Sequence, residues 1–453
     1  MTSSSSQSAN RSLDDLSCQE SRYALTDARL PGCLLDDTAG PADAASPGDD
    51  GLAAFDLVIA QGRIEALYPS GSESSLPPAR IDLAGRLVLP AFVDAHVHLD
   101  KGHIAPRAPT DGTFEGALAR VGIDREAHWS ATDVEARMAF GLACAWAHGS
   151  CAVRTHLDSP APQDAISWPV FERLRARWTG RIELQAACLA GIDAYRDLRW
   201  FGSLVARVAD AGGVLGAVTW PMPDLDALLD RMFVAAAEHG LDLDFHADET
   251  HDPDSRTLDA IARAALRHRF DGRVLVGHCC SLSRQPDDVV LDTLDRVAEA
   301  GLDIVSLPMC NLYLQDRQAG VTPRWRGVTL VQELQSRGIP VSLASDNTRD
   351  PFYAYGDLDP LEVLRQGTRI AHLDHPFGDW AASVAARPAE ALGLAARAGR
   401  IGVGRRADLV VCRGRDWSEV LSRTERERTV LRDGRAIDTR LPDYAELDPL
   451  MNP

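Results

Sequence analysis

The chain has 453 residues, 45% of them hydrophobic, and a formal net charge of −19 at pH 7. This length fits an α/β barrel of ~250 residues with a small extra domain, and the negative charge excludes nucleic acid and anionic membranes as expected partners, because both would repel it. Nine cysteines without a C-x-x-C motif, and a start that lacks a signal-peptide pattern, predict a cytoplasmic protein with reduced thiols.

Both ends of the chain differ in character from its middle. Residues 1–50 are rich in Ser, Asp, Ala, Gly and Pro, which predicts a flexible segment. Short strand-like runs follow, such as "FDLVIAQGRIEAL", and runs of the same kind return near the end, such as "RADLVVCRGRD". They predict one small β-sandwich-like domain built from residues 51–88 and 400–440, with a C-terminal tail at 441–453.

Residues 89–399 alternate apolar runs with amphipathic helical runs such as "DLDALLDRMFVAAAEHG". Eight runs predict strands: "RLVLPAFVDAHVH", "CAVRTHLD", "IELQAACLAG", "LGAVTWPM", "LDLDFHADE", "RVLVGHCCS", "LDIVSLPMCN" and "PVSLASDN". The predicted fold class is therefore α/β, a distorted (β/α)8 TIM-type barrel. Its active site is expected at the carboxyl ends of these strands.

Polar side chains with metal-binding chemistry end four of the predicted strands. His96 and His98 in "LPAFVDAHVHLDK" are two residues apart, so in a strand both imidazoles face the same way. His246, His278 and Asp346 each close another run. Imidazole nitrogens with a carboxylate suit one Zn²⁺ or Fe²⁺ ion with room for water, and such a water becomes a nucleophile at neutral pH.

The sequence resembles the amidohydrolase superfamily, and within it the cytosine deaminase group, over residues 52–440. The matching motifs are "HVHLD", "GTFEG", "VRTHLD", "HADE", "GHC", "NLYLQDR" and "SDNTRDPF". The resemblance implies a metal held by His96, His98, His246 and Asp346, and proton transfer by Glu249 and His278. It also implies that the chain forms a homo-oligomer, as relatives commonly assemble.

The position of the lysine favours a single metal ion. Superfamily members with two metals commonly bridge them with a carbamylated lysine from the fourth strand. Here the fourth run, "LGAVTWPM", has no lysine, and the chain's only lysine is Lys101, after the first strand. We therefore expect one divalent metal per chain, which is frequent among the deaminases of the superfamily.

The expected reaction is hydrolytic deamination of an amino-substituted heterocycle. Glu249, preferred over its neighbour Asp248, would pass a proton to a ring nitrogen, while His278 and Asp346 would take the proton of the metal-bound water. Ammonia would then leave. Two alternatives are hydrolysis of a ring amide or alkylamino substituent, and a catalytically silent metal-binding scaffold.

The expected substrate differs from cytosine. Leu189 stands where the resembling deaminases carry a glutamine that reads the pyrimidine amide edge, and Asn347 and Phe352 replace an acid and a tryptophan. A site that relies on a hydrogen bond discriminates strongly when that bond is lost. The ring is therefore expected to be a substituted pyrimidine, a pterin, a triazine or a creatinine-like lactam.

Three further residues are candidates for substrate binding. Lys101 could contact an acidic or carbonyl group or lie at the barrel rim, Trp220 could stack on a flat ring or pack in the core, and Gln315 could hydrogen-bond the ring. Other polar residues near the strand ends are interpreted as packing or orienting groups; they are His156, Cys279 and Cys280.

Overall fold

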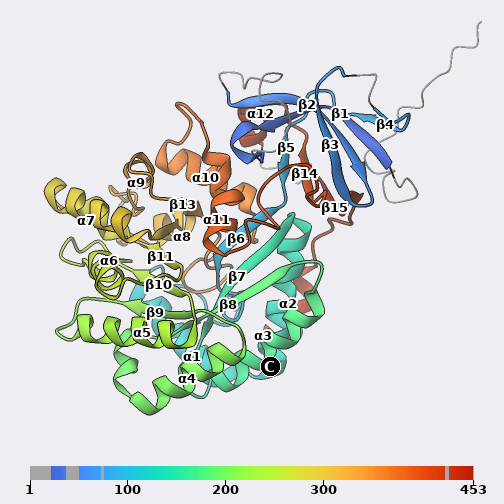
Figure 1. The fold of residues 1–453 in the computed structure, drawn as a ribbon. Coiled ribbons are helices and arrows are strands. Elements are labelled where there is room, and N and C mark those ends of the chain that lie inside the picture. Colours follow the sequence, from blue (N-terminus) through green and yellow to red (C-terminus); the bar gives the residue numbers. More distant parts are fainter. Residues whose placement is uncertain (1–21, 37–49, 73–75, 424–427, 452–453) are drawn as a thin grey trace, which may run out of the picture.

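The structure is a computed structural model that describes residues 22–36, 50–72, 76–423 and 428–451. Within these residues, eight parallel strands follow one another around a barrel (Figure 1). They are β6 (Phe92–Val97), β7 (Ser150–Asp158), β8 (Glu183–Leu189), β9 (Leu215–Thr219), β10 (Leu243–Ala247), β11 (Val274–His278), β12 (Asp303–Ser306) and β13 (Val341–Leu343). The predicted α/β barrel is confirmed, and its strands are those eight apolar runs.

Isolated bridges join the two sheets of the barrel. β6, β7 and β8 form one sheet, and β9 to β13 form the other. Ala187 pairs with Val214 between β8 and β9, and Val97 pairs with Asp346 just after β13. These sparse contacts make the barrel distorted. They also bring the first and last strands of the barrel together.

The strands form where apolar residues run without interruption, as in parallel sheets covered on both faces. Every residue of β6, β10 and β11 is buried. Helices supply the outer layer: α1 (Phe114–His128), α2 (Ala131–Ala147), α3 (Asp164–Trp178), α4 (Leu198–Asp210), α5 (Leu225–His239), α6 (Thr257–His268), α7 (Asp287–Ala300), α8 (Pro308–Leu314), α9 (Val331–Ser336), α10 (Pro360–Ala371) and α11 (Ala386–Ala391). Among the described helices, none is long and apolar enough to span a membrane.

Short 3-10 helices complete the connections of the barrel. They are η4 (Ile192–Arg196), η5 (Cys280–Arg284) and η6 (Trp380–Val384). η5 begins directly after β11 and η4 follows β8, so both lie at the carboxyl ends of strands. In a barrel this is the face where ligands bind.

Strands from both ends of the chain lie beside the barrel in two small sheets (Figure 1). One sheet has the order β3-β2-β1-β4 and the other β16-β15-β14-β5. Their apolar faces share one core, which includes Leu25, Leu57, Val88 and Leu409. The elements are β1 (Arg22–Pro31), η2 (Gly32–Leu34), β2 (Leu52–Ala60), β3 (Arg63–Pro69), β4 (Arg80–Asp82), β5 (Val88–Pro90), β14 (Leu409–Cys412), α12 (Trp417–Ser422), β15 (Arg428–Arg432) and β16 (Arg435–Ala436).

The segment expected to be flexible contains a central strand. β1 lies within residues 1–50 and pairs antiparallel with β2 and parallel with β4. Its sequence "RYALTDARLP" buries Tyr23, Leu25, Ala28 and Leu30, and this burial stabilises the strand. The expectation is therefore corrected for residues 22–34, while residues 1–21 and 37–49 lie outside the described part of the chain.

The C-terminal tail is also structured. η7 (Tyr444–Leu447) and α13 (Asp448–Met451) place Leu447 and Met451 in a small apolar cluster with Phe140 and Cys144 of α2. The Leu450 carbonyl accepts a hydrogen bond from Arg107 at 3.0 Å. Apolar residues spaced four apart on a short helix give this segment a face to bury, which explains why residues 441–451 dock on the barrel.

A buried ion pair links the barrel to the small sheets. Arg428 of β15 donates from Nη1 to Asp359 Oδ1 at 2.9 Å, and its Nη2 lies 2.9 Å from His148 Nδ1. We expect Asp359→Asn to lower the free energy of unfolding by about 3 kcal/mol, because Arg428 then keeps a buried charge without its partner. Urea denaturation measures this, with Asp438→Asn as the control, since Asp438 pairs with Arg440 at the surface. Equal effects of both changes would contradict the prediction.

Candidate active site

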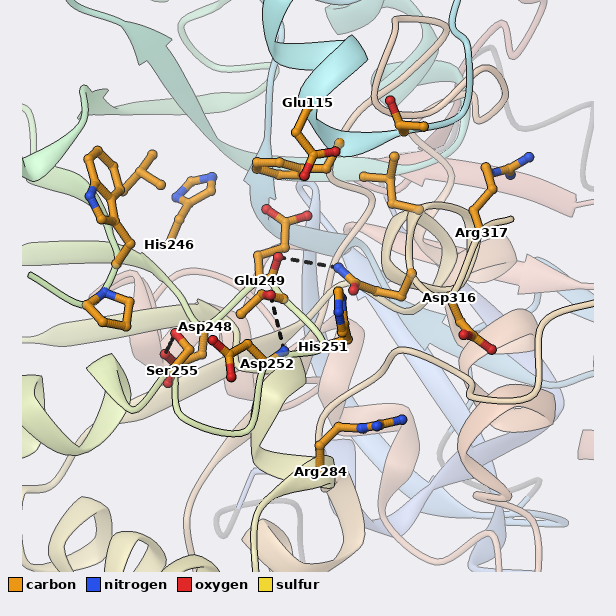
Figure 2. Close-up of a pocket in the computed structure, with 18 of the residues that line it drawn as sticks. Glu115, His246, Asp248, Glu249, His251, Asp252, Ser255, Arg284, Asp316 and Arg317 are labelled. Atoms are coloured by element: carbon orange, nitrogen blue, oxygen red, sulfur yellow. Dashed lines mark hydrogen bonds between the residues drawn. The ribbon is translucent and has the colours of Figure 1, made fainter. Parts of the chain in front are cut away.

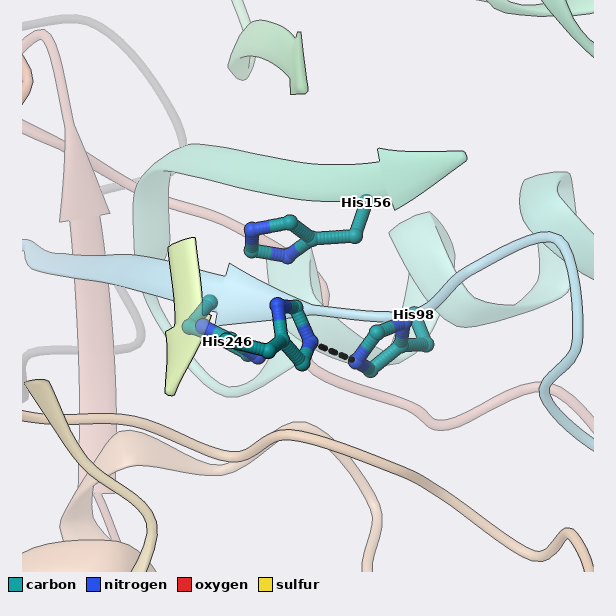
Figure 3. A group of neighbouring side chains, drawn as sticks. His98, His156 and His246 are labelled. Atoms are coloured by element: carbon teal, nitrogen blue, oxygen red, sulfur yellow. Dashed lines mark hydrogen bonds between the residues drawn. The ribbon is translucent and has the colours of Figure 1, made fainter. Parts of the chain in front are cut away.

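Histidine side chains from several strands converge at the carboxyl ends of the barrel strands. His98 Nε2 lies 3.3 Å from His246 Nε2 and 3.2 Å from Asp346 Oδ1, and His96 Nε2 lies 3.6 Å from the same carboxylate oxygen. Figure 3 shows the rings of His98 and His246 facing each other. The four residues implied as metal ligands are thus brought together, from the first, fifth and last strands.

The donor atoms of this group fit a divalent metal ion. Both ring nitrogens of His96, and both carboxylate oxygens of Asp346, are buried without a hydrogen-bond partner among the described residues. Two nitrogens bound to one tetrahedral Zn²⁺ at about 2.0–2.1 Å are roughly 3.3 Å apart, which is the separation of His98 Nε2 and His246 Nε2. A buried polar atom without a partner lowers the stability of the folded protein. A bound cation would provide a partner for these nitrogen and oxygen atoms and so explains why they converge.

Burial keeps these imidazoles neutral. It lowers the pKa of His96, His98 and His246 well below the ordinary histidine value, and the neighbouring imidazoles lower it further. Neutral rings expose the lone pairs that a metal requires. Burial also raises the pKa of Asp346 to about 8, and a cation at this place would stabilise its ionised form instead.

Unusual backbone geometry aims two of the side chains. His278 and Asp346 have φ values of 70° and 63°, in the left-handed region that residues with a Cβ rarely adopt. Gly277 leaves space for the His96 ring, since a Cβ there would come within 3.0 Å of His96 Cε1. The sequence "VLVGHCC" therefore combines an apolar strand with the one residue type that admits the ring.

Glu249 and Asp248 have clearly different surroundings. Asp248 accepts hydrogen bonds from Ser255 Oγ and from the backbone N–H groups of Thr257 and Leu258, at the start of α6. Asp248 therefore caps the first backbone N–H groups of α6. Glu249 instead lines the cavity and lies between His246 and the loop of Asp316 in Figure 2.

The carboxyl of Glu249 favours the protonated form. Its Oε1 lies 3.3 Å from His278 Nδ1. Burial raises the pKa of Glu249 well above the ordinary value, and the nearby Asp346 carboxylate raises it further. A carboxyl whose pKa is raised above the ordinary value is better suited to act as an acid.

His156 lies against the group of implied ligands, near the rings of both His98 and His246 (Figure 3), and its ring centroid is 4.0 Å from that of His96. Its Nε2 lies 2.9 Å from Asp244 Oδ1, and Arg154 donates to Asp244 Oδ2 at 3.1 Å. His156 also has a ring nitrogen close enough to belong to a possible metal group with His96, His98 and His246. Its bond to Asp244 is the geometry expected of an orienting group.

An open cavity of about 520 Å³ adjoins the histidines. Leu189, Trp220 and Phe352 line it together with His98, His246 and Glu249. A second compartment of about 670 Å³, drawn in Figure 2, shares Trp220, His246 and Glu249 with the first and is lined by Gln315. All five side chains predicted to contact the substrate therefore line one or both compartments, Lys101 in the first.

The structure shows where the side chains of Lys101 and Trp220 lie, while their contact with substrate stays a prediction. Lys101 is buried rather than at the barrel rim, and its Nζ lies 2.8 Å from Asp158 Oδ1 and 5.6 Å from the Phe352 ring centroid. Trp220 is 39% exposed within the cavity, which excludes a core position. Gln315 Nε2 donates to the Glu249 carbonyl at 3.4 Å and so also contacts the Glu249 loop.

The adjacent cysteines do not join the possible metal groups found among the described residues. Cys279 and Cys280 are fully buried, and burial raises the pKa of both thiols well above the ordinary value. A thiol that resists ionisation is a poor metal ligand. The burial of both side chains agrees with the interpretation that they are packing residues.

One side chain of the site was not predicted. Asn311, in the quoted motif "NLYLQDR", is fully buried, and its Nδ2 lies 3.0 Å from His278 Nδ1. The sequence feature that could have identified Asn311 as a site residue is its position soon after the seventh strand, four residues before Gln315. That spacing places both residues on one face of a helix.

Comparisons with known proteins agree with this site. Residues 79–166 and 175–437 match the amidohydrolase family. The chain is 51% identical to a pterin deaminase of Rhizobium rhizogenes over 95% of its length and 97% of the relative. It is 23% identical to an N-isopropylammelide isopropyl amidohydrolase of a Pseudomonas species, over 79% of this chain and 87% of the relative.

A solved structure extends the similarity to the fold. A 5-methylcytosine deaminase of Klebsiella pneumoniae, crystallised with 5-fluorocytosine, superposes with a TM-score of 0.78 and 25% identity. The match covers 93% of this chain and 98% of that one. The small sheets from the two chain ends are thus included in the shared architecture.

Proposed function

The chain belongs to the amidohydrolase family, and from this premise we propose that it hydrolytically deaminates a pterin ring at its amino-bearing carbon. It is a hydrolase that acts on carbon–nitrogen bonds and deaminates an amino-substituted heterocycle. The identity of 51% with a pterin deaminase over 95% of the chain carries the choice of ring. The apolar Leu189 in the cavity supports a substrate other than cytosine, because it cannot replace the glutamine that hydrogen-bonds the ring in the resembling cytosine deaminases.

Four side chains would hold the metal in this proposal: His96, His98, His246 and Asp346. Zn²⁺ or Fe²⁺ bound there supplies an acidified water and so a nucleophile at neutral pH. One ion per chain is proposed, because the only lysine is paired with Asp158 and lies outside the possible metal groups of the described residues.

Glu249 and Asp346 would move the protons of the reaction. Glu249 gives its proton to the ring nitrogen beside the amino-bearing carbon, which makes that carbon electrophilic. The water oxygen bonds to this carbon while one water proton passes to Asp346 and then to the amino group, which leaves as ammonia. The remaining hydroxyl proton returns to Glu249 and the ring carbonyl forms. Each carboxyl group thereby regains its starting state.

The cavity suits a flat, fused ring. Leu189, Trp220 and Phe352 give it apolar surface, and His98, His246 and Glu249 meet at its inner end. A pterin has a second ring beyond its amino-bearing pyrimidine ring, so this apolar surface can contact it while the amino group lies at the inner end. Burial of a flat aromatic surface adds binding free energy without requiring a hydrogen bond.

Product analysis with a panel of amino-heterocycles tests this proposal. The metal-loaded protein is incubated with pterin, 5-methylcytosine, cytosine and N-isopropylammelide, and ammonia and isopropylamine are quantified. We expect ammonia and the dioxo product from pterin, with a kcat/KM at least about 100-fold above that for cytosine, since cytosine has no second ring to cover the apolar surface of the cavity. Isopropylamine release without pterin turnover would favour alkylamine hydrolysis instead.

A cytoplasmic location and a homo-oligomer stay predictions. The eight described cysteines are all free, which fits a reducing compartment. Leu118 and Ile123 of α1 are 60% and 70% exposed, and exposed apolar side chains of this size are available for contact with a second copy. Sedimentation of the purified protein determines the oligomeric state.

A further inference from the structure

Asn311 connects His278 and Glu249, the two residues for which the family resemblance implies proton transfer. Its Nδ2 lies 3.0 Å from His278 Nδ1 and 3.4 Å from Glu249 Oε1. Its Oδ1 is buried and has no hydrogen-bond partner among the described residues. Both N–H groups of the amide are therefore available to two acceptors.

Counting hydrogen bonds supports this orientation of the amide. In the structure, the two N–H groups on Asn311 Nδ2 each have an acceptor, and only the carbonyl oxygen Oδ1 has no partner among the described residues. If the amide were rotated by 180°, its oxygen could accept one bond from His278, but two buried N–H groups would lose their partners. Unpaired buried donors carry a free-energy penalty, so the network favours the first orientation.

With the amide in this orientation, the contact sets which ring nitrogen of neutral His278 carries the proton. A ring nitrogen that accepts a hydrogen bond has no hydrogen, so with Nδ1 as the acceptor the proton lies on Nε2. His278 Nε2 is buried and unpaired among the described residues. His278, His96 and Asp346 also form one of the possible metal groups, so a ring nitrogen of His278 lies close to the reaction centre.

We propose that Asn311 is a positioning residue that fixes His278 as a hydrogen-bond donor, with its Nε2–H directed at the attacking oxygen. This inference rests on the proposed deaminase reaction and adds a role for His278 to it. The sequence led us to expect that His278 shares with Asp346 the task of accepting the water proton. Asp346 accepts that proton alone, as in the proposed reaction, and His278 instead orients and stabilises the oxygen.

Two substitutions at Asn311 separate the tautomer effect from loss of a contact. Asn311→Leu removes both donors, and we expect kcat to fall about 100-fold with KM little changed, as for loss of one donor at a transition state. Asn311→Asp places an acceptor at Nδ1 and reverses the tautomer. We expect kcat to fall about 10³- to 10⁴-fold, since a wrong histidine tautomer in a Ser-His-Asp triad costs ~10⁴.

The visible absorption spectrum of the Co²⁺-loaded protein provides a readout that does not depend on turnover. In Asn311→Asp the reversed tautomer directs a lone pair of His278 Nε2 toward the metal, so we expect a changed spectrum. Asn311→Leu should keep the spectrum of the unmodified protein. Met309→Leu is the matched control, because Met309 is a buried core residue of the same helix and the change conserves volume.

The results distinguish three outcomes. A spectrum unchanged by Asn311→Asp, with a kcat no lower than that of Asn311→Leu, would overturn the proposed control of the tautomer. Equal loss of activity in Met309→Leu and Asn311→Leu would assign Asn311 to helix packing. If the unmodified, metal-loaded protein fails to convert pterin, the proposed function fails, while the Co²⁺ spectra still test the tautomer.

Discussion

Replacing Glu249 with glutamine is expected to lower kcat by about 10³- to 10⁴-fold, as measured by ammonia release from pterin. Glutamine has nearly the same shape but no proton to give to the ring nitrogen, and general acid catalysis contributes typically 10²–10⁴-fold. Metal content should stay near one ion per chain, because Glu249 is outside the possible metal groups of the described residues.

The matched control is Glu115→Gln. Glu115 is an exposed carboxylate of α1 that lines the same compartment as Glu249 (Figure 2). We expect nearly normal kcat from it, which would show that replacing a carboxyl group in this compartment with an amide does not by itself abolish turnover. A nearly normal kcat in Glu249→Gln itself would remove the residue from the proposed mechanism.

Removal of the metal is expected to abolish turnover, and addition of Zn²⁺ or Fe²⁺ should restore it. The protein should also become less stable, because an ion that binds only the folded state contributes about 2.7 kcal/mol at a free concentration 100 times its Kd. Elemental analysis, thermal unfolding and ammonia release on chelated and reloaded protein measure these changes together.

Two histidine variants locate the metal. His98→Ala should lose the ion, since His98 Nε2 faces both His246 Nε2 and Asp346 Oδ1. His251→Ala should keep it, because His251 lines the cavity but is exposed and outside the possible metal groups. Full metal content in His98→Ala, or full turnover by metal-free protein, would contradict the proposed site.

The sequence was most informative where one physical pattern repeats. Eight apolar runs of strand length predicted the barrel, because a parallel strand with both faces covered has no polar alternation. Once the barrel is predicted, His96, His246 and Asp346 must approach one another, since the carboxyl ends of all its strands meet at one face. No knowledge of side-chain orientation is required for that inference.

Contacts between distant segments could not be predicted in the same way. β1 lies in a polar segment, and its stability comes from β2 and β4 on either side. From the sequence, Asp248 is a second candidate for the proton donor beside its neighbour Glu249. Its hydrogen bonds to the start of α6 assign it a structural role instead. Asn311 is significant only through two partners, His278 at the end of β11 and Glu249 just after β10. In each case the partner, and not the local sequence, decides the role.

The closure of the barrel also has a consequence for synthesis of the chain. Val97 pairs with Asp346, and the Asp346 N–H donates to the His96 carbonyl at 2.9 Å. The proposed metal ligands therefore sit on both sides of this final seam, and the segment from β6 to β12 must emerge from the ribosome before Asp346 does. With the proposed ligands, a nascent chain would have the histidines but lack the carboxylate, and activity would begin only when the last barrel strand pairs with the first.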